Sequence, residues 1–192
     1  MSAADVFDSA DRGLLYAVLD AADAPDVPAR MIEPGVQARA LYSSRVNPEL
    51  AEAAPYLVRV NLELMGWIHE KLWADHWGIL IEAQMELADL RRHLRHFLLT
   101  EDPQGRELYF RFYDPRTLRT FLPSCNPDEL AEFFGPVEAY IARGPSPDEF
   151  RRYTLSWAEP LPRYRLSGLS SRGVSGTGDK GSQSPGAAYE DA

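Results

Sequence analysis

The stretch Arg106–Arg119, RELYFRFYDPRTLR, constrains the fold most, because it predicts a strand that passes directly into a helix. Residues 107–113 alternate as a strand does. One face carries Leu108, Phe110 and Phe112, and the other carries Tyr109, Arg111 and Tyr113. Asp114 and Pro115 then suit an N-cap and the first helical position. The stretch contains no obvious nucleophile or metal ligand, which indicates a surface that binds a partner and does not react with it.

Strands and helices alternate along the rest of the chain. Apolar runs predict strands over residues 14–20, 39–42, 56–60, 77–82, 98–101, 137–141 and 153–157. Helical spacing and start signals predict helices over residues 24–33, 62–73, 86–97 and 126–134. Residues 102–105, DPQG, fit a type I turn that joins the strand at 98–101 to the one at 107–113 as a hairpin. We expect an α+β fold: a single mixed domain with a central sheet and flanking helices.

The two ends of the chain differ from this pattern. Residues 167–192 contain six glycines and six serines and almost no large apolar side chain, which predicts a disordered tail. Residues 1–11 are acidic, have no apolar run that would make a signal peptide, and are expected to be flexible. The folded domain is then expected to cover residues 12–166.

Charge and cysteine content limit the function classes. The net charge of −9 argues against nucleic acid and against an anionic membrane surface as partners. No stretch approaches the roughly 18 apolar residues of a membrane span, so we expect no stable membrane insertion. The single cysteine, Cys125, allows no internal disulfide, which favours a cytoplasmic location.

Reactive side chains form no recognisable site. His93 and His96 share the polar side of the predicted helix at 86–97, but exposed histidines are common there and nothing completes a metal set. Cys125, in LPSCNP, has no base near it in the sequence to form a thiolate. The sequence therefore predicts no enzymatic activity, no cofactor and no metal. A hydrolase that uses Cys125 or the histidines stays open as an alternative.

The helix at 86–97 carries a basic patch in an otherwise acidic protein. Arg91, Arg92 and Arg95 lie along one flank of its apolar stripe. Two interpretations stay open: a solvated helix face whose side chains lie over the edge of the core, or a docking patch for an acidic partner segment.

Several motifs, in order, resemble a known family. They are YAVLDAA at 16–22, APYLVRV at 54–60, WGILIEA at 77–83, the long run at 90–125 and LAEFFGPVEAYI at 130–141. FRFYDPR at 110–116, followed by LPSC and FGP, is the most specific piece. Together they resemble the bacterial type VI secretion effector chaperones, also called adaptor proteins, whose domain was long described as one of unknown function.

The resemblance implies a cytoplasmic protein that is neither an enzyme nor secreted. Such a protein binds the N-terminal region of a toxic effector, often one that contains transmembrane helices, and helps to load it onto the spike protein. The effector would then meet a partly exposed apolar surface with Arg111, Tyr113 and Arg116 at its rim. Alternatively, Arg111 and Asp114 pair to lock the corner between strand and helix. An immunity or regulatory module that binds a toxin is the alternative function.

Overall fold

A computed structural model describes residues 3–42, 54–72, 76–102, 104–144, 150–158 and 163–167. The helices are α1 (Ala3–Asp11), α2 (Val27–Met31), α4 (Leu62–Trp67), which continues into the π-helical turn η1 (Ile68–Leu72), α5 (Leu87–Arg95), α6 (Pro115–Ser124) and α7 (Pro127–Phe134). The strands are β1 (Leu15–Asp20), β2 (Ala38–Ala40), β3 (Pro55–Arg59), β4 (Gly78–Glu82), β5 (Leu99–Glu101), β6 (Glu107–Tyr109), β7 (Ala139–Arg143), β8 (Phe150–Ala158) and β9 (Arg163–Ser167).

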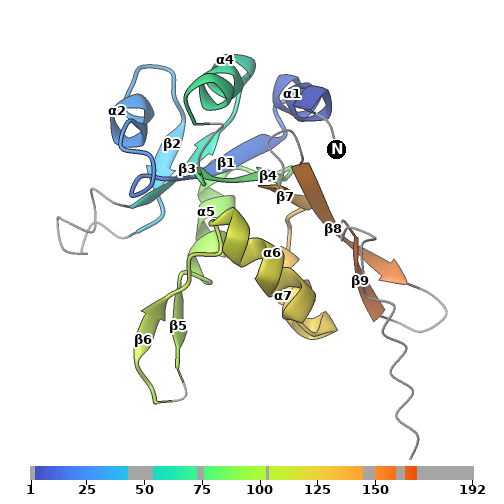
Figure 1. Cartoon of the computed structure of the whole chain (residues 1–192). Helices are drawn as coiled ribbons and strands as arrows, with labels where there is room; N and C mark the ends of the chain where they lie inside the picture. Colours follow the sequence, from blue (N-terminus) through green and yellow to red (C-terminus); the bar gives the residue numbers. More distant parts are fainter. Residues whose placement is uncertain are drawn as a thin grey trace, which may run out of the picture.

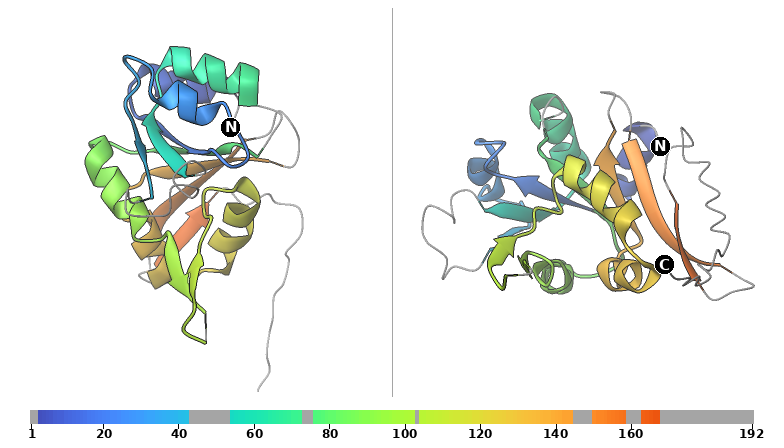
Figure 2. Two further views of the ribbon diagram at one scale, coloured as in Figure 1. Left: turned by 90° about the vertical axis from the view of Figure 1, so that its left-hand side faces the viewer. Right: turned by 60° about the horizontal axis from the view of Figure 1, so that its bottom comes forward.

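Within the described residues, seven strands form one sheet with helices on both of its faces. The strand order is β2-β3-β1-β4-β7-β8-β9, and every pairing is antiparallel. Helices α1, α2 and α4 cover one face, drawn above the sheet in Figure 1, and α5, α6 and α7 cover the other. Figure 2 shows the same layers from two further directions. The expected mixed α+β fold with a central sheet is confirmed.

The inner strand β1 is buried on both faces, and the domain has a core on each side of the sheet. Tyr16 and Val18 belong to the core under α5, α6 and α7. Leu15, Ala17 and Leu19 belong to the core under α1, α2 and α4. Because successive side chains of a strand point to opposite faces, a continuous apolar run such as LYAVL suits a strand covered on both sides.

Gly78 lets β4 pair closely with β1. Its φ is +146°, and a Cβ atom built on it would lie 1.8 Å from the carbonyl oxygen of Val18. Only glycine adopts this backbone conformation without strain and leaves room for the neighbouring carbonyl group.

The predicted helix starts of α6 and α7 are confirmed. The Asp114 side chain accepts a hydrogen bond from the backbone N–H of Arg116 at 2.8 Å. Asn126 and Glu129 form a reciprocal capping box at the start of α7. Local side-chain chemistry therefore sets where both helices begin.

The prediction of a flexible N-terminus is wrong for residues 3–11, which form α1. Val6 and Ala10, one helical turn apart, are buried against the sheet. The helix also connects to the sheet through Ser9, whose hydroxyl donates a 2.7 Å hydrogen bond to Glu82. Tertiary packing rather than helix propensity accounts for this element. Residues 168–192 of the predicted tail lie outside the described residues.

The strand predicted over 107–113 is shorter than expected. It ends at Tyr109, and the chain turns through residues 110–114 into α6. The hairpin of β5 and β6 is confirmed, with Leu99 opposite Tyr109 and Glu101 opposite Glu107. Among the described helices, none has both the length and the apolar character needed to cross a membrane.

Candidate functional site

The corner between β6 and α6 is locked by Arg111, but not through the expected partner. The Arg111 guanidinium forms an ion pair with Asp20, at the end of β1, and a second one at 3.2 Å with Asp23. The expected alternative, an Arg111–Asp114 pair, is wrong because the turn directs Arg111 toward β1. The guanidinium also lies over the Tyr113 ring, 5.9 Å from its centre.

Asp20 is the more deeply buried of the two carboxylates at this corner, since it is 1% exposed and Asp114 is 6% exposed. Burial raises the pKa of Asp20, although hydrogen bonds from Arg111 and from the backbone N–H of Ala22 at 3.1 Å act in the opposite direction. A buried carboxylate of this kind needs its cation, because desolvation disfavours the charged form. The Arg111–Asp20 ion pair at this corner therefore has mainly a structural role.

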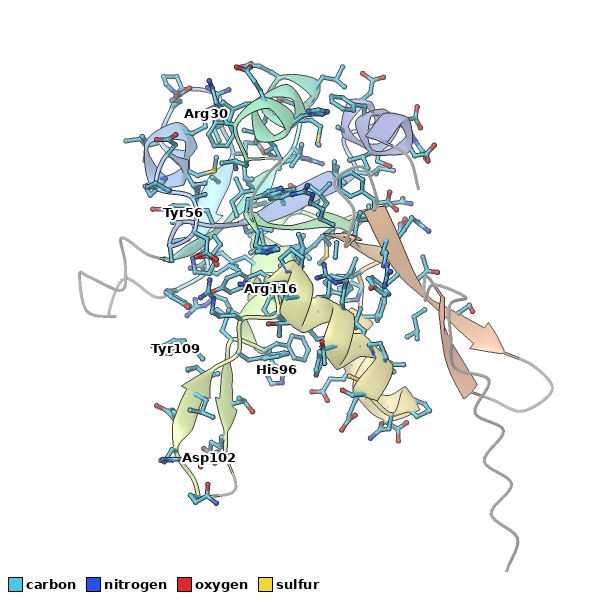
Figure 3. All side chains as sticks on the ribbon, in the orientation of Figure 1. Arg30, Tyr56, His96, Asp102, Tyr109 and Arg116 are labelled. Atoms are coloured by element: carbon cyan, nitrogen blue, oxygen red, sulfur yellow. The ribbon has the colours of Figure 1, made fainter. Side chains whose placement is uncertain are left out.

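Arg116 pairs with Asp114 at the start of α6. Its Nε and Nη2 atoms donate hydrogen bonds of 2.6 to 3.1 Å to both carboxylate oxygens. Burial alone would raise the pKa of Asp114, but the hydrogen bonds from Arg116 outweigh it and lower that pKa. Arg116 is exposed at the N-terminal end of α6, as Figure 3 shows, so its charge borders the surface while its partner is fixed.

Tyr113 lies in the core and not at the rim of a surface. It is 2% exposed, and its hydroxyl lies 3.2 Å from that of Tyr42. Burial is the main cause that raises the Tyr113 pKa. The predicted alternation placed this side chain on an outer strand face, but β6 has already ended, and the turn buries both Phe112 and Tyr113.

The hairpin of β5 and β6 presents apolar side chains to solvent. Leu99 is 50% exposed, Leu108 47% and Tyr109 46%. We call these three residues the hairpin surface. The hairpin projects away from the rest of the domain in Figure 1, and Figure 3 shows Tyr109 near its base and Asp102 near its tip. Leu99 and Tyr109 pair across the hairpin and share one of its faces, whereas Leu108 lies on the other face, so the exposed apolar side chains occupy both faces of this element. Exposed apolar side chains on a projecting element are typical of an interaction site.

The base of the hairpin is held firmly by the core. Leu98 is buried, and its carbonyl oxygen accepts a 2.9 Å hydrogen bond from the backbone N–H of Phe110. Phe110 packs edge-on against Phe121 of α6, with ring centres 4.7 Å apart. The exposed part of the hairpin is thus presented on a fixed base, which lowers the entropy lost on binding.

The three predicted arginines of α5 have different surroundings. Arg91 is half-buried and donates through Nε to the carbonyl oxygen of Ala40 at 2.8 Å. Arg92 is exposed and forms an ion pair with Asp89 at 2.8 Å. Arg95 is exposed and has no hydrogen bond or ion pair with any residue that the structure describes. A solvated helix face accounts for Arg92 and Arg95, whereas Arg91 lies over the edge strand β2, so both interpretations of the patch stay open.

Sequence reasoning did not group Arg39 with the arginines of α5, but the fold brings it to the same face of the domain. Arg39 belongs to the edge strand β2, and its charge lies close enough to that of Arg91 to lower the Arg91 pKa. We call Arg39, Arg91, Arg92, Arg95 and His96 the α5 basic face. No local signal links β2 to α5, because their proximity depends on sheet pairing.

Tyr42 connects the predicted site residues of α5 with those of the corner. Its carbonyl oxygen accepts a 3.4 Å hydrogen bond from Arg91, and its hydroxyl contacts that of Tyr113. Its ring lies 5.2 Å from that of Tyr109 on the hairpin surface. The α5 basic face and the hairpin surface are therefore continuous through the segment 40–42.

The side chains weighed as reactive groups have structural surroundings. Burial, and next the charge of Glu129, raises the pKa of Cys125 to about 11, and its thiol donates to the carbonyl oxygen of Phe121 at 3.3 Å. His93 Nε2 lies 3.0 Å from the carbonyl oxygen of Phe133, and burial lowers the His93 pKa. The described residues contain no group of three or more His, Cys, Asp and Glu side chains arranged to hold a metal.

Comparison with known proteins adds one match. The family described as "Domain of unknown function (DUF4123)" matches residues 15–132, which run from the start of β1 into α7 and include the corner, the hairpin surface and α5. No curated protein and no solved structure matches the chain significantly.

Proposed function

The chain belongs to the DUF4123 family, and from this premise we propose that it is a cytoplasmic adaptor chaperone for a type VI secretion effector. In this proposal it binds the N-terminal region of the effector and helps to load it onto the spike protein. The order of the motifs between residues 16 and 141, which resembles that of the effector chaperones, supports the same function.

The observation that carries the proposal is the hairpin surface. Leu99, Leu108 and Tyr109 are each about half exposed on an element that projects from the domain. A protein that keeps apolar helices of another chain in solution needs an apolar surface of its own to cover them. Because the hairpin base is packed into the core, this surface is available before the partner arrives.

Two further features are consistent with a binding role. The net charge of −9 keeps a complex with an apolar client soluble. The raised pKa of Cys125 keeps its thiol protonated at neutral pH, which does not favour a thiolate nucleophile.

Co-expression tests the proposal. In the family that the chain resembles, the effector is usually encoded next to its chaperone, so the probe is a large product of an adjacent reading frame, expressed alone, with the wild-type protein, or with Leu99→Ser/Leu108→Ser. Ile32→Ser is a matched control, because Ile32 is 82% exposed but follows α2 on the opposite face of the sheet. We expect the wild type and the control to raise the soluble level of the effector, and the hairpin variant to raise it much less.

The possible results separate the function from its location. An effector level that does not change when this protein is absent contradicts the chaperone function. A hairpin variant that acts as well as the wild type contradicts the hairpin surface as the binding site. Binding to the C-terminal toxin half alone supports an immunity module in its place.

A further inference from the structure

Three arginines of the α5 basic face have no carboxylate partner among the described residues. Arg39 donates through Nη1 to the carbonyl oxygen of Ala38 at 2.8 Å. Arg91 donates to the carbonyl oxygens of Ala40 and Tyr42. These acceptors are neutral, and Arg95 has no described partner at all, so the positive charges of this face are not compensated locally.

The three charges also repel one another. Burial lowers the pKa of Arg91, and the neighbouring charges of Arg95 and Arg39 lower it further. The protein has 29 acidic residues and 20 Lys and Arg residues, so a shortage of acids does not explain an arginine cluster that has no carboxylate partner in the described part of the chain. A negatively charged partner would relieve the repulsion and gain charge-assisted hydrogen bonds.

Two neighbouring hollows lie on this face. A hollow of about 530 Å³ lies between β2 and the start of α5 and is bordered by Val36, Leu87 and Arg39. A second hollow, of about 470 Å³, is bordered by Arg95 and His96. The two hollows share Ala88 and Arg91 in their linings, so they adjoin along the outer side of α5, and we call them together the α5 groove.

The surroundings of the groove limit the kind of anion that it suits. Glu86 lines the first hollow, Asp89 pairs with Arg92, and Glu132 lies 3.3 Å from His96. These acids confine the uncompensated positive charge to a short stretch. A long polyanion such as nucleic acid, or an anionic membrane, would meet the surrounding negative charge, whereas a short acidic segment would not.

We propose that the groove along α5 binds an acidic polypeptide segment, with its carboxylates on Arg39, Arg91 and Arg95 and an apolar side chain between Val36 and Leu87. The groove differs from the hairpin surface in its residues and in its chemistry. The inference extends the proposed function, because it assigns to the partner a second binding segment, which is acidic. It does not depend on which effector the protein binds.

A synthetic peptide tests this inference without any effector. The probe is a fluorescein-labelled peptide of about 15 residues in which glutamates alternate with leucines and alanines, and its control has glutamine at every glutamate position. Fluorescence anisotropy measures binding to the full chain. We expect the glutamate peptide to bind, the glutamine peptide to bind at least about tenfold more weakly, and the affinity to fall as salt is raised.

Charge reversal locates the site. We expect Arg39→Glu and Arg95→Glu each to weaken binding of the glutamate peptide by about fivefold or more. Arg12→Glu is the matched control, because it makes the same charge change at an exposed position after α1, and it should have little effect. Thermal melting of each variant checks that the fold is kept.

Three peptide-binding results would each overturn the inference: no binding of the glutamate peptide at about 1 mM, equal binding of the glutamine peptide, or an equal loss in Arg12→Glu. Tighter binding of a short DNA duplex or of phosphatidylserine vesicles would overturn it as well. Because the peptide is not an effector, none of these results bears on the chaperone function.

Discussion

Replacing Arg111 with methionine should destabilise the domain, because it leaves a buried carboxylate without its cation. Asp20 is 1% exposed and would keep only the 3.1 Å hydrogen bond from the backbone N–H of Ala22. Methionine keeps the length of the arginine stem, so the change removes charge and hydrogen bonds more than packing.

The magnitude follows from the burial of the two partners. Removing one partner of a fully buried ion pair costs about 3–5 kcal/mol. The Arg111 side chain is 42% exposed, so solvent already screens the pair and water can reach part of the vacated space. We therefore expect a loss of about 2 kcal/mol at neutral pH, or a fall of about 4–8 °C in Tm for a chain of this size.

The loss should depend on pH. Burial raises the pKa of Asp20 in the folded protein, so the folded state holds this proton more tightly than the unfolded state. The stability that the group provides is complete in acid and is lost as pH rises through the raised pKa. Removing Arg111 raises that pKa further and enlarges the loss at neutral pH. The difference in the free energy of unfolding between the variant and the wild type should therefore shrink as pH falls toward about 4, the ordinary pKa of an aspartate.

Urea unfolding, followed by tryptophan fluorescence at pH 7 and near pH 4.5, measures the effect. Arg116→Met is the comparison variant. Asp114 is also buried, but Arg116 is more exposed than Arg111, 53% against 42%, and Asp114 keeps the 2.8 Å hydrogen bond from the backbone N–H of residue 116, so the loss should be smaller. Asp20→Asn combined with Arg111→Met should lose less than the two single changes added together. An Arg111→Met variant within about 0.5 kcal/mol of the wild type at pH 7, or with the same deficit at both pH values, would refute the reasoning.

Three further predictions concern the backbone, a helix cap and the thiol. Gly78→Ala should lose at least about 4 kcal/mol in urea unfolding, because its Cβ would lie 1.8 Å from the Val18 carbonyl oxygen; Gly66→Ala, with open space around it, should be neutral or stabilising. Asn126→Ala should cost about 1 kcal/mol by removing the capping box of α7, and an unchanged urea midpoint would contradict this. Cys125 should react with iodoacetamide much more slowly than free cysteine at pH 7.5, and its rate should rise toward a pKa of about 11; labelling as fast as that of free cysteine would disprove it.

Local chemistry could be predicted from the sequence, and long-range contacts could not. The starts of α6 and α7 depend on side chains within four residues of one another, so Asp114 and Asn126 indicated them correctly. Helix α1 depends on the sheet that Val6 covers, and nothing in its own sequence indicates that sheet. The partner of Arg111 lies 91 residues away along the chain, so the sequence suggested the nearer Asp114.

The candidate site shows the same division. The basic residues of α5 could be found from their helical spacing, whereas Arg39 joins them only through the pairing of β2 with β3. The predicted position of Tyr113 was wrong because the alternation of side chains between strand faces was extended beyond Tyr109, where β6 ends. Leu99 and Leu108 read as ordinary strand residues, and only the structure shows that the hairpin presents them to solvent. A partner-binding role for the five predicted arginines, Arg91, Arg92, Arg95, Arg111 and Arg116, stays a prediction, whereas Tyr113 is buried in the core.

The most direct test of the proposed adaptor function is the affinity of the purified protein for each half of the candidate effector encoded by an adjacent reading frame, measured by isothermal titration calorimetry. We predict that the N-terminal half binds, that Leu99→Ser/Leu108→Ser weakens this binding while Ile32→Ser leaves it unchanged, and that the C-terminal half does not bind. Binding confined to the C-terminal half, or no binding to either, would contradict the proposed function.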